Sequence, residues 1–243
     1  MRLWKAWIVA KKDISVFRKN KYILYSLIAM PLVLALPIPA TIFYLSPSQI
    51  PLEVLTPIMN GMLSFFILIP AILPTIIASY SFVGEKMEKS LEPLLATPTT
   101  DNELLVGKCL AAFLPSIIAT YIGSAGFVIL VGIETYNRFG VILFPNWEWA
   151  VIMAFAAPLA CILSVEMNVI ISSRVNDVRA AQQLGGIAVL PIILIYFLAQ
   201  LGIAEINVFY MLVVSSILFV ADLALYYISR KVFQREEILT KWK

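Results

Sequence analysis

The chain contains no histidine among its 243 residues, and charge is scarce throughout. Without histidine it cannot form an HExxH zinc site, a histidine general base or a Ser-His-Asp triad. It also lacks a GxxxxGK[ST] phosphate-binding loop and an aspartate-rich run that would hold magnesium-pyrophosphate. We therefore expect no catalytic residue, no bound cofactor and no metal ion in this chain, and nothing in it indicates a nucleic-acid partner.

Long apolar runs take the place of the missing charge. Charged residues make up 14% of the chain and hydrophobic residues 61%, whereas about a quarter of a soluble domain is charged. The mean hydropathy is +0.91. Roughly 20 mostly apolar residues in a helix cross the hydrocarbon of a bilayer. Six runs are long enough, and they cover residues 22–45, 57–83, 104–132, 148–172, 184–204 and 206–229. We predict an all-α polytopic membrane protein with a single six-helix transmembrane domain over residues 21–243.

The basic residues are distributed unevenly between the predicted loops. Of the 18 Lys and Arg residues, 17 fall in residues 1–21, 84–108, 173–183 and 230–243, and only Arg138 falls in a loop on the other side. Basic loops remain in the cytoplasm. We therefore predict a multi-pass protein of the cell (inner or plasma) membrane with both termini cytoplasmic, including a short basic tail at residues 230–243.

Residues 1–20 precede the first predicted span and have a different pattern. Apolar residues recur there at helical spacing, and lysines fall on another face. The apolar positions are Leu3, Trp7, Ala10, Ile14 and Phe17, and the lysines are Lys5, Lys12 and Lys19. The pattern predicts an amphipathic helix in the inner interface of the membrane, in contact with lipid. The alternative is a frayed basic tail.

Two ionisable residues, Glu166 and Asp222, lie inside predicted spans. Each is about 9–10 Å from the cytoplasmic end of its span, at about 1.5 Å per residue. Charged residues at such positions are functional candidates because an unpaired charge in the membrane is unfavourable. They either line a substrate path or a gate, or have a structural role. In the structural role they reach the interface, pair with Arg174 or Arg230, or stay protonated.

The densest charge between two spans is in the run GEKMEKSLEPLLATP at residues 84–98. Its apolar residues fall at i, i+4, i+7 and i+8 of one helical face, namely Met87, Leu91, Leu94 and Leu95. Pro93 predicts a bend near Leu91 or Glu92, and Thr100 with Glu103 fits a capping box that starts the next helix. An apolar ridge with charged flanks suits docking in a groove on a soluble partner. It would also suit packing on the protein's own helices or on lipid.

The run FVGEKMEKSLEPLLATP at residues 82–98, followed by Glu103-Leu104 and Gly107-Lys108, resembles the signature of ABC-2 type permeases. The family pattern is roughly GE(K/R)E-x-(G/K)-(T/S)-LE-x-LL-x-TP, and Met87 stands where the family often has glutamate. The likeness extends to the amphipathic N-terminus, the six predicted spans and the tail FQREEIL at residues 233–239.

The resemblance implies the transmembrane subunit of an ABC transporter, usually an exporter. Two permeases would form a dimer and work with two separate ATPase subunits, which would carry ATP and Mg. The cytoplasmic segment 84–101 between the second and third spans would be the coupling segment seated on the ATPase. The coupling residues that the resemblance implies are Gly84, Glu85, Lys86, Met87, Glu88, Leu91, Glu92, Leu94, Leu95, Thr97 and Pro98.

Two other functions fit parts of the sequence. The first is a stand-alone secondary transporter or channel that is driven by an ion gradient and uses Glu166 and Asp222. Such proteins often contain internal repeats, and we find no convincing repeat between residues 22–132 and 148–229. The second is an ATPase-partnered membrane protein that exerts force without transport. The short predicted loops do not indicate a substrate.

Overall fold

The structure is a computed structural model that describes residues 2–35, 37, 39–40, 44, 51–63, 65–88, 90, 99–194 and 207–234. Every regular element within these ranges is a helix. Four helical segments are long and apolar enough to cross a membrane: Leu52–Met87, Asp101–Phe139, Trp147–Ser172 and Val208–Val232. They confirm the predicted apolar helices at 57–83, 104–132, 148–172 and 206–229, and the protein is a helical membrane protein.

Some of these segments consist of several successive elements. The first comprises α4 (Leu52–Leu63), α5 (Phe65–Ser79), the π-helix η1 (Tyr80–Gly84) and α6 (Glu85–Met87). The second is α8 (Asp101–Phe139). The third comprises α9 (Trp147–Val151), the π-helix η2 (Ile152–Ala156) and α10 (Ala157–Ser172), and the fourth is α13 (Val208–Val232).

Two shorter helices lie where the first and fifth spans are predicted. They are α2 (Lys21–Ala35) and α11 (Val178–Ala188), within apolar helical stretches at Lys21–Val33 and Val178–Leu194. Much of residues 36–50 and all of residues 195–206 lie outside the described part of the chain. The count of six spans therefore stays a prediction.

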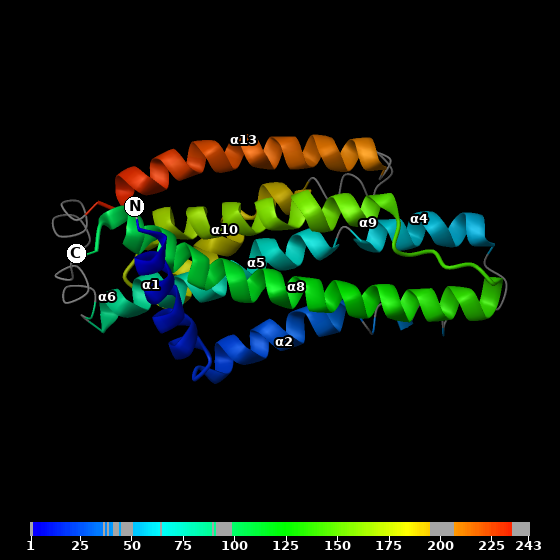
Figure 1. The fold of residues 1–243 in the computed structure, drawn as a ribbon, viewed down its shortest axis with the longest axis horizontal. Helices are drawn as coiled ribbons and strands as arrows, with labels where there is room; N and C mark the ends of the chain where they lie inside the picture. The colour runs from blue at the N-terminus through cyan, green and yellow to red at the C-terminus, as the bar shows by residue number, and fades with distance from the viewer. Residues whose placement is uncertain are drawn as a thin grey trace.

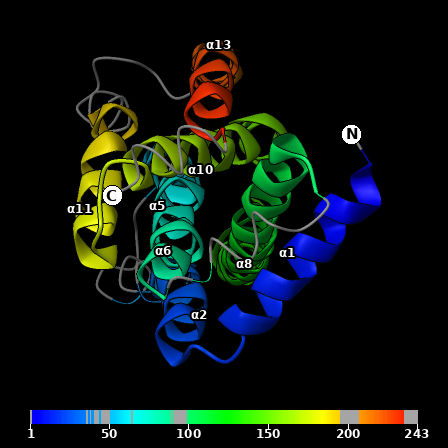
Figure 2. The same ribbon diagram turned by 90° about the vertical axis from the view of Figure 1, so that its left-hand side faces the viewer.

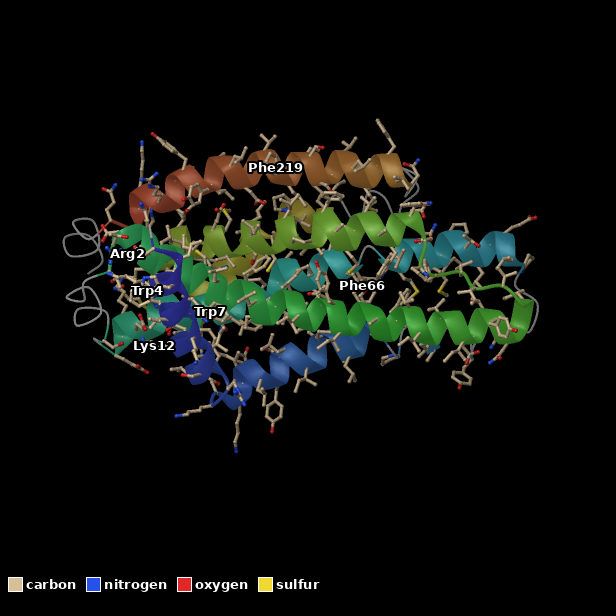
Figure 3. All side chains as sticks on the ribbon, viewed as in Figure 1. Arg2, Trp4, Trp7, Lys12, Phe66 and Phe219 are labelled. Carbon is tan, nitrogen blue, oxygen red and sulfur yellow. The ribbon has the colours of Figure 1, made fainter. Side chains whose placement is uncertain are left out.

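The helix α5 lies at the centre of the bundle, with α2, α8, α10 and α11 around it (Figure 2). The most apolar 18-residue stretch of the segment Leu52–Met87 is 82% buried, whereas the corresponding stretch of Val208–Val232 is 28% buried. Phe66 of α5 is therefore a core residue, whereas Phe219 of α13 points away from the bundle (Figure 3). The exposed apolar face of α13 is the kind of surface that lipid covers in a membrane protein.

The basic segments gather at one end of the bundle. The N-terminus, α6, the start of α8 and the end of α13 all lie there (Figure 1). The helix α8 has 39 residues, which at about 1.5 Å per residue makes it roughly 58 Å long, about twice the thickness of the hydrocarbon. Its ends therefore extend beyond the hydrocarbon. That the basic end faces the cytoplasm remains a prediction.

The N-terminal segment forms α1 (Leu3–Phe17), so the alternative of a frayed tail is wrong. The helix packs against the first part of α8, at the edge of the bundle (Figure 2). The contact is close, because a Cβ atom at Gly107 would lie 2.7 Å from the carbonyl oxygen of Ala6.

The predicted apolar ridge of α1 divides between two faces. Ala10 and Phe17 are buried, whereas Leu3 and Trp7 are exposed, together with Trp4 (Figure 3). The buried face packs on the protein, and the tryptophan face is left for the predicted membrane interface.

The helix α6, at the start of the predicted coupling segment, ends at Met87. The backbone N–H of Ser90 donates to the carbonyl oxygen of Glu85 at 3.0 Å. The bend predicted near Leu91 or Glu92 lies outside the described residues. The predicted coupling residues Leu91, Glu92, Leu94, Leu95, Thr97 and Pro98 lie outside the described residues.

Candidate functional site

A group of buried charges connects α1, α6 and α8 at the basic end of the bundle. We call it the charge cluster; it consists of Lys12, Asp13, Ser81, Glu85 and Lys108. The Lys108 side chain is fully buried, and its Nζ lies 2.6 Å from Oε2 of Glu85 and 3.4 Å from Oδ2 of Asp13. One ammonium group of α8 thus forms ion pairs with a carboxylate of α6 and a carboxylate of α1.

Hydrogen bonds complete the surroundings of these charges. The Lys108 ammonium donates to the carbonyl oxygen of Ser81 at 2.8 Å, and the Ser81 hydroxyl donates to Oδ2 of Asp13 at 2.7 Å. Lys12 forms an ion pair with Glu85, and its Nζ also lies 3.5 Å from Oδ1 of Asp13. Two carboxylates therefore face two ammonium groups, and the buried charges are balanced.

Lys12 is the half-exposed member of the charge cluster. Burial by itself lowers the pKa of its ammonium group, but the hydrogen bond with Glu85 and the charges of Glu85 and Asp13 outweigh burial and raise that pKa. Lys12 therefore remains positively charged at neutral pH, and the balance of charge in the cluster persists.

The π-helix η1 forms one wall of the charge cluster. π-Helices are rare, and they occur mostly as single wide turns, often at functional sites. Here the wide turn carries Ser81, whose carbonyl group accepts from Lys108. The Phe82 ring of the same turn has its centroid 5.3 Å from the Lys108 ammonium. The irregular turn near the end of the apolar segment Leu52–Met87 thus supplies both a polar and an aromatic contact to α8.

The start of α8 is held by the predicted capping box, which the structure confirms. The Thr100 hydroxyl accepts from the backbone N–H of Glu103 at 3.3 Å, and the Glu103 carboxylate accepts from the backbone N–H of Thr100 at 3.1 Å. The other Glu103 oxygen accepts from the backbone N–H of Arg2 at 2.7 Å. The predicted coupling segment 84–101 is therefore held near both of its ends, by Glu85 and by Thr100.

The described coupling residues divide into inward and outward positions. Glu85 points into the bundle, where its side chain is 11% exposed. Lys86 donates to the carbonyl of Val175 at 3.4 Å, in the connection between α10 and α11. Gly84 is half-buried, and Met87 and Glu88 are exposed. Glu85 thus contacts this chain itself, and Met87 and Glu88 are the described positions that a partner could reach.

The two intramembrane carboxylates lie on neighbouring helices, Glu166 on α10 and Asp222 on α13. Each residue is 6% exposed, and the two helices pack against each other. Within the described part of the chain, no hydrogen-bond partner is found for Oε2 of Glu166 or for either oxygen of Asp222.

One of the structural alternatives, a pairing of these carboxylates with Arg174 or Arg230, is not found among the described residues. Arg174 and Arg230 are exposed, and no ion pair joins either of them to Glu166 or Asp222 in the described residues. Arg174 follows the end of α10 and Arg230 lies in the last turn of α13, both at the surface, whereas Glu166 and Asp222 are buried further along the same helices.

A family model described as an ABC-2 family transporter protein matches residues 17–178, about two thirds of the chain. The chain belongs to the ABC-2 transporter family. It is therefore a multi-pass membrane protein, of a family whose permeases associate in general with ABC ATPases. No curated protein matches the chain.

The match to the ABC-2 family covers only part of the site. It includes Ser81, Glu85, Lys108 and Glu166, whereas Asp13 and Asp222 lie outside it. Glu85 is among the residues predicted from the sequence, whereas Asp13, Ser81 and Lys108 were not predicted to be its neighbours. One signal was present: Asp13 is the only acidic residue in residues 1–20. It also lies on the helical face of Ala6, Ala10 and Phe17, which is buried against this permease's own α8.

Proposed function

We propose that this chain is the transmembrane permease subunit of an ABC exporter and that separate ATPase subunits drive it through residues 84–98. The observation that carries the proposal is the charge cluster, in which Glu85, at the start of the coupling segment, is paired with Lys108 of α8. Removing one partner of a buried ion pair strongly destabilises a protein, because the other charge is left buried and unpaired. Glu85 and Lys108 are therefore expected to stay together when either helix moves. A displacement of α6 by the ATPase would therefore move α8, and with it α1.

The remaining parts of the proposal rest on the resemblance to ABC-2 permeases and on the distribution of basic residues. ATP and Mg would be held by the ATPase chains, and this chain would perform no chemistry. Two permease copies, identical or homologous, would enclose the path between them, with both termini of each in the cytoplasm. Closure of the ATPases on nucleotide would press on the coupling segments and separate or rotate the second and third spans.

The first test is a double substitution in the coupling segment, Leu94→Asp with Leu95→Asp. The chain is purified with its co-eluting proteins in mild detergent, and ATP hydrolysis is measured. We expect a stoichiometric ATPase partner with the unaltered chain, and loss of the partner and of permease-dependent ATP hydrolysis with the variant. The physical reason is that docking would bury the two new carboxylates without any group that compensates their charge, which is unfavourable.

A matched control is Val141→Asp with Ile142→Asp. Like Leu94 and Leu95, these residues are adjacent and apolar in the sequence. Val141 and Ile142 are exposed, and they follow α8 at the opposite end of the bundle (Figure 1). The control pair should leave ATP hydrolysis unchanged. Normal partner binding and ATP hydrolysis in the Leu94/Leu95 variant would remove the proposed role of the coupling segment.

The unpartnered carboxylates favour one other function, gradient-driven transport by Glu166 and Asp222. In that case the chain would purify without an ATPase, and transport into vesicles would need an ion gradient and no ATP. A complex that hydrolyses ATP but moves no substrate would instead indicate a protein that exerts force on the membrane. A transport assay with and without ATP therefore separates the three functions.

A further inference from the structure

A cavity of about 220 Å³ lies between α8, α10 and α13. Its walls are mostly apolar and aromatic, and they include Leu105, Cys109 and Phe113 of α8, Ile162 of α10 and Tyr226 of α13. Cys109 directly follows Lys108, so adjacent positions of α8 face the cavity and the charge cluster. The cavity is thus separate from the charge cluster, although one helix borders both.

Glu166 is the only acidic group in the described wall of this cavity. The residue is 6% exposed, and its Oε2 has no hydrogen-bond partner within the described part of the chain. Asp222 is four residues before Tyr226 on α13, so it occupies the same helical face one turn away. The cavity therefore has two nearby carboxylates and, within the described residues, no cation paired with either.

The walls define which ligand would fit. Buried charges are normally paired with an opposite charge, so a positive ligand would compensate Glu166. Apolar walls favour a ligand with an apolar body, and the rings of Tyr226 and Phe113 attract a cation through their faces. A bare metal ion fits less well, because no group of three or more acidic, cysteine or histidine ligands occurs in the described residues and hard cations need several oxygen ligands.

We propose that this cavity binds a lipophilic monovalent cation, with Glu166 as its counter-charge. Asp222 adds negative potential from the next turn of α13, and the apolar walls hold the body of the ligand. The proposal does not depend on the proposed ATPase coupling, because binding can be measured on this chain alone.

Benzyltrimethylammonium is a suitable probe, because it is small, partly aromatic and permanently charged. The purified full chain in phosphatidylcholine nanodiscs is titrated with the tritiated probe in a scintillation proximity assay. We expect saturable binding at one site per chain. Neopentylbenzene has the same shape without the charge, and it should displace the probe at least tenfold less well than unlabelled benzyltrimethylammonium.

Two substitutions test the site from different directions. Glu166→Gln keeps the shape and removes the charge, so we expect at least a tenfold loss of affinity. Val106→Phe fills the cavity from α8 without changing any charge, and it should also weaken binding at least tenfold. The matched control is Glu134→Gln, whose carboxylate pairs with Arg138 near the far end of α8. This control should bind as the unaltered chain does.

Three results would overturn the proposal. They are the absence of saturable binding, unchanged affinity in the Glu166→Gln chain, and equal displacement by the neutral analogue, which would mean a purely apolar cavity. Folding of each variant is checked by its elution from size exclusion. If Glu166→Gln does not fold, Val106→Phe and the neutral analogue decide the question.

Discussion

Two pairs of buried acids lie in the same bundle with opposite surroundings. Asp13 and Glu85 face two ammonium groups and the Ser81 hydroxyl. Glu166 and Asp222 are buried to a similar degree, but the described residues provide no cation for them. Burial alone therefore does not define the role of an acid. The first pair is compensated by ammonium groups of the chain and connects three helices, whereas the proposed role of Glu166 in the second pair is to receive a cation from outside.

The largest effect is expected for Lys108→Met. The substitution keeps the volume of the side chain but leaves Asp13 and Glu85 with only the half-exposed Lys12. Removing one partner of a buried ion pair costs ~3–5 kcal/mol, and we expect a large fall in the midpoint of thermal unfolding in detergent. Lys11→Met is the control, because Lys11 is exposed on the same helix as Asp13. If Lys108→Met and Lys11→Met were equally stable, the ion pairs of Lys108 with Asp13 and Glu85 would not stabilise the fold.

A triple variant makes the comparison sharper. The variant carries Asp13→Asn, Glu85→Gln and Lys108→Met. It removes the Lys108 ammonium group together with both carboxylates that form ion pairs with it. Because an uncharged replacement of a buried ion pair is often close to neutral, we expect most of the stability lost in Lys108→Met to return. ATP hydrolysis by the complex should remain low if the ion pair transmits motion. Full activity of the triple variant would show that the charges are dispensable for coupling.

The same substitution applied to each pair should have opposite outcomes. Glu85→Gln loses charge-assisted contacts with Lys108 and Lys12, and the expected cost is about 1.5–3 kcal/mol. Glu166→Gln removes a buried carboxyl group that has no cation among the described residues, so the midpoint of unfolding should stay or rise. Both are measured by thermal unfolding at neutral pH without added cation. A loss of stability in Glu166→Gln equal to that in Glu85→Gln would mean that the two pairs are alike.

The geometry of the charge cluster depends on close packing of α1 on α8. In Gly107→Ala the new Cβ would lie 2.7 Å from both the Ala6 carbonyl oxygen and the Val9 Cβ. Overpacking of this kind costs ~1–3 kcal/mol, and the displacement of α1 should separate Asp13 from Lys108. Gly126→Ala is the control in the same helix, because nothing lies within 4 Å of its Cβ position. The control should be neutral or slightly stabilising in thermal unfolding.

The smallest expected effect is that of Thr100→Ala. The variant removes the hydroxyl that accepts from Glu103 and leaves the ion pairs of the charge cluster intact. The loss of a helix cap typically costs ~1 kcal/mol. The control is Ser216→Ala, an exposed hydroxyl in the interior of α13, which should change little. A drop as large as that of Lys108→Met would mean that the cap, and not the charge, holds this end of α8.

Local features of the fold could be predicted from the sequence, and contacts between distant segments could not. The long apolar runs and the capping box at Thr100 are confirmed, because each depends on neighbouring residues and on the energetics of a helix in lipid. The end of α6 at Met87, with the Ser90 N–H bonded to the Glu85 carbonyl, was not predicted.

By itself the sequence determined that this chain is a helical membrane protein, where four of its long apolar helices run, and which family its signature resembles. Apolar length and local hydrogen bonding are enough for these conclusions. Only the tertiary structure decided which acids are paired. Asp13, Glu85 and Lys108 lie on three different helices, and their contact results from the packing of α1 and α6 on α8. Whether a buried carboxylate is balanced depends on what packs against it, and the spacing of residues along the chain does not contain that information.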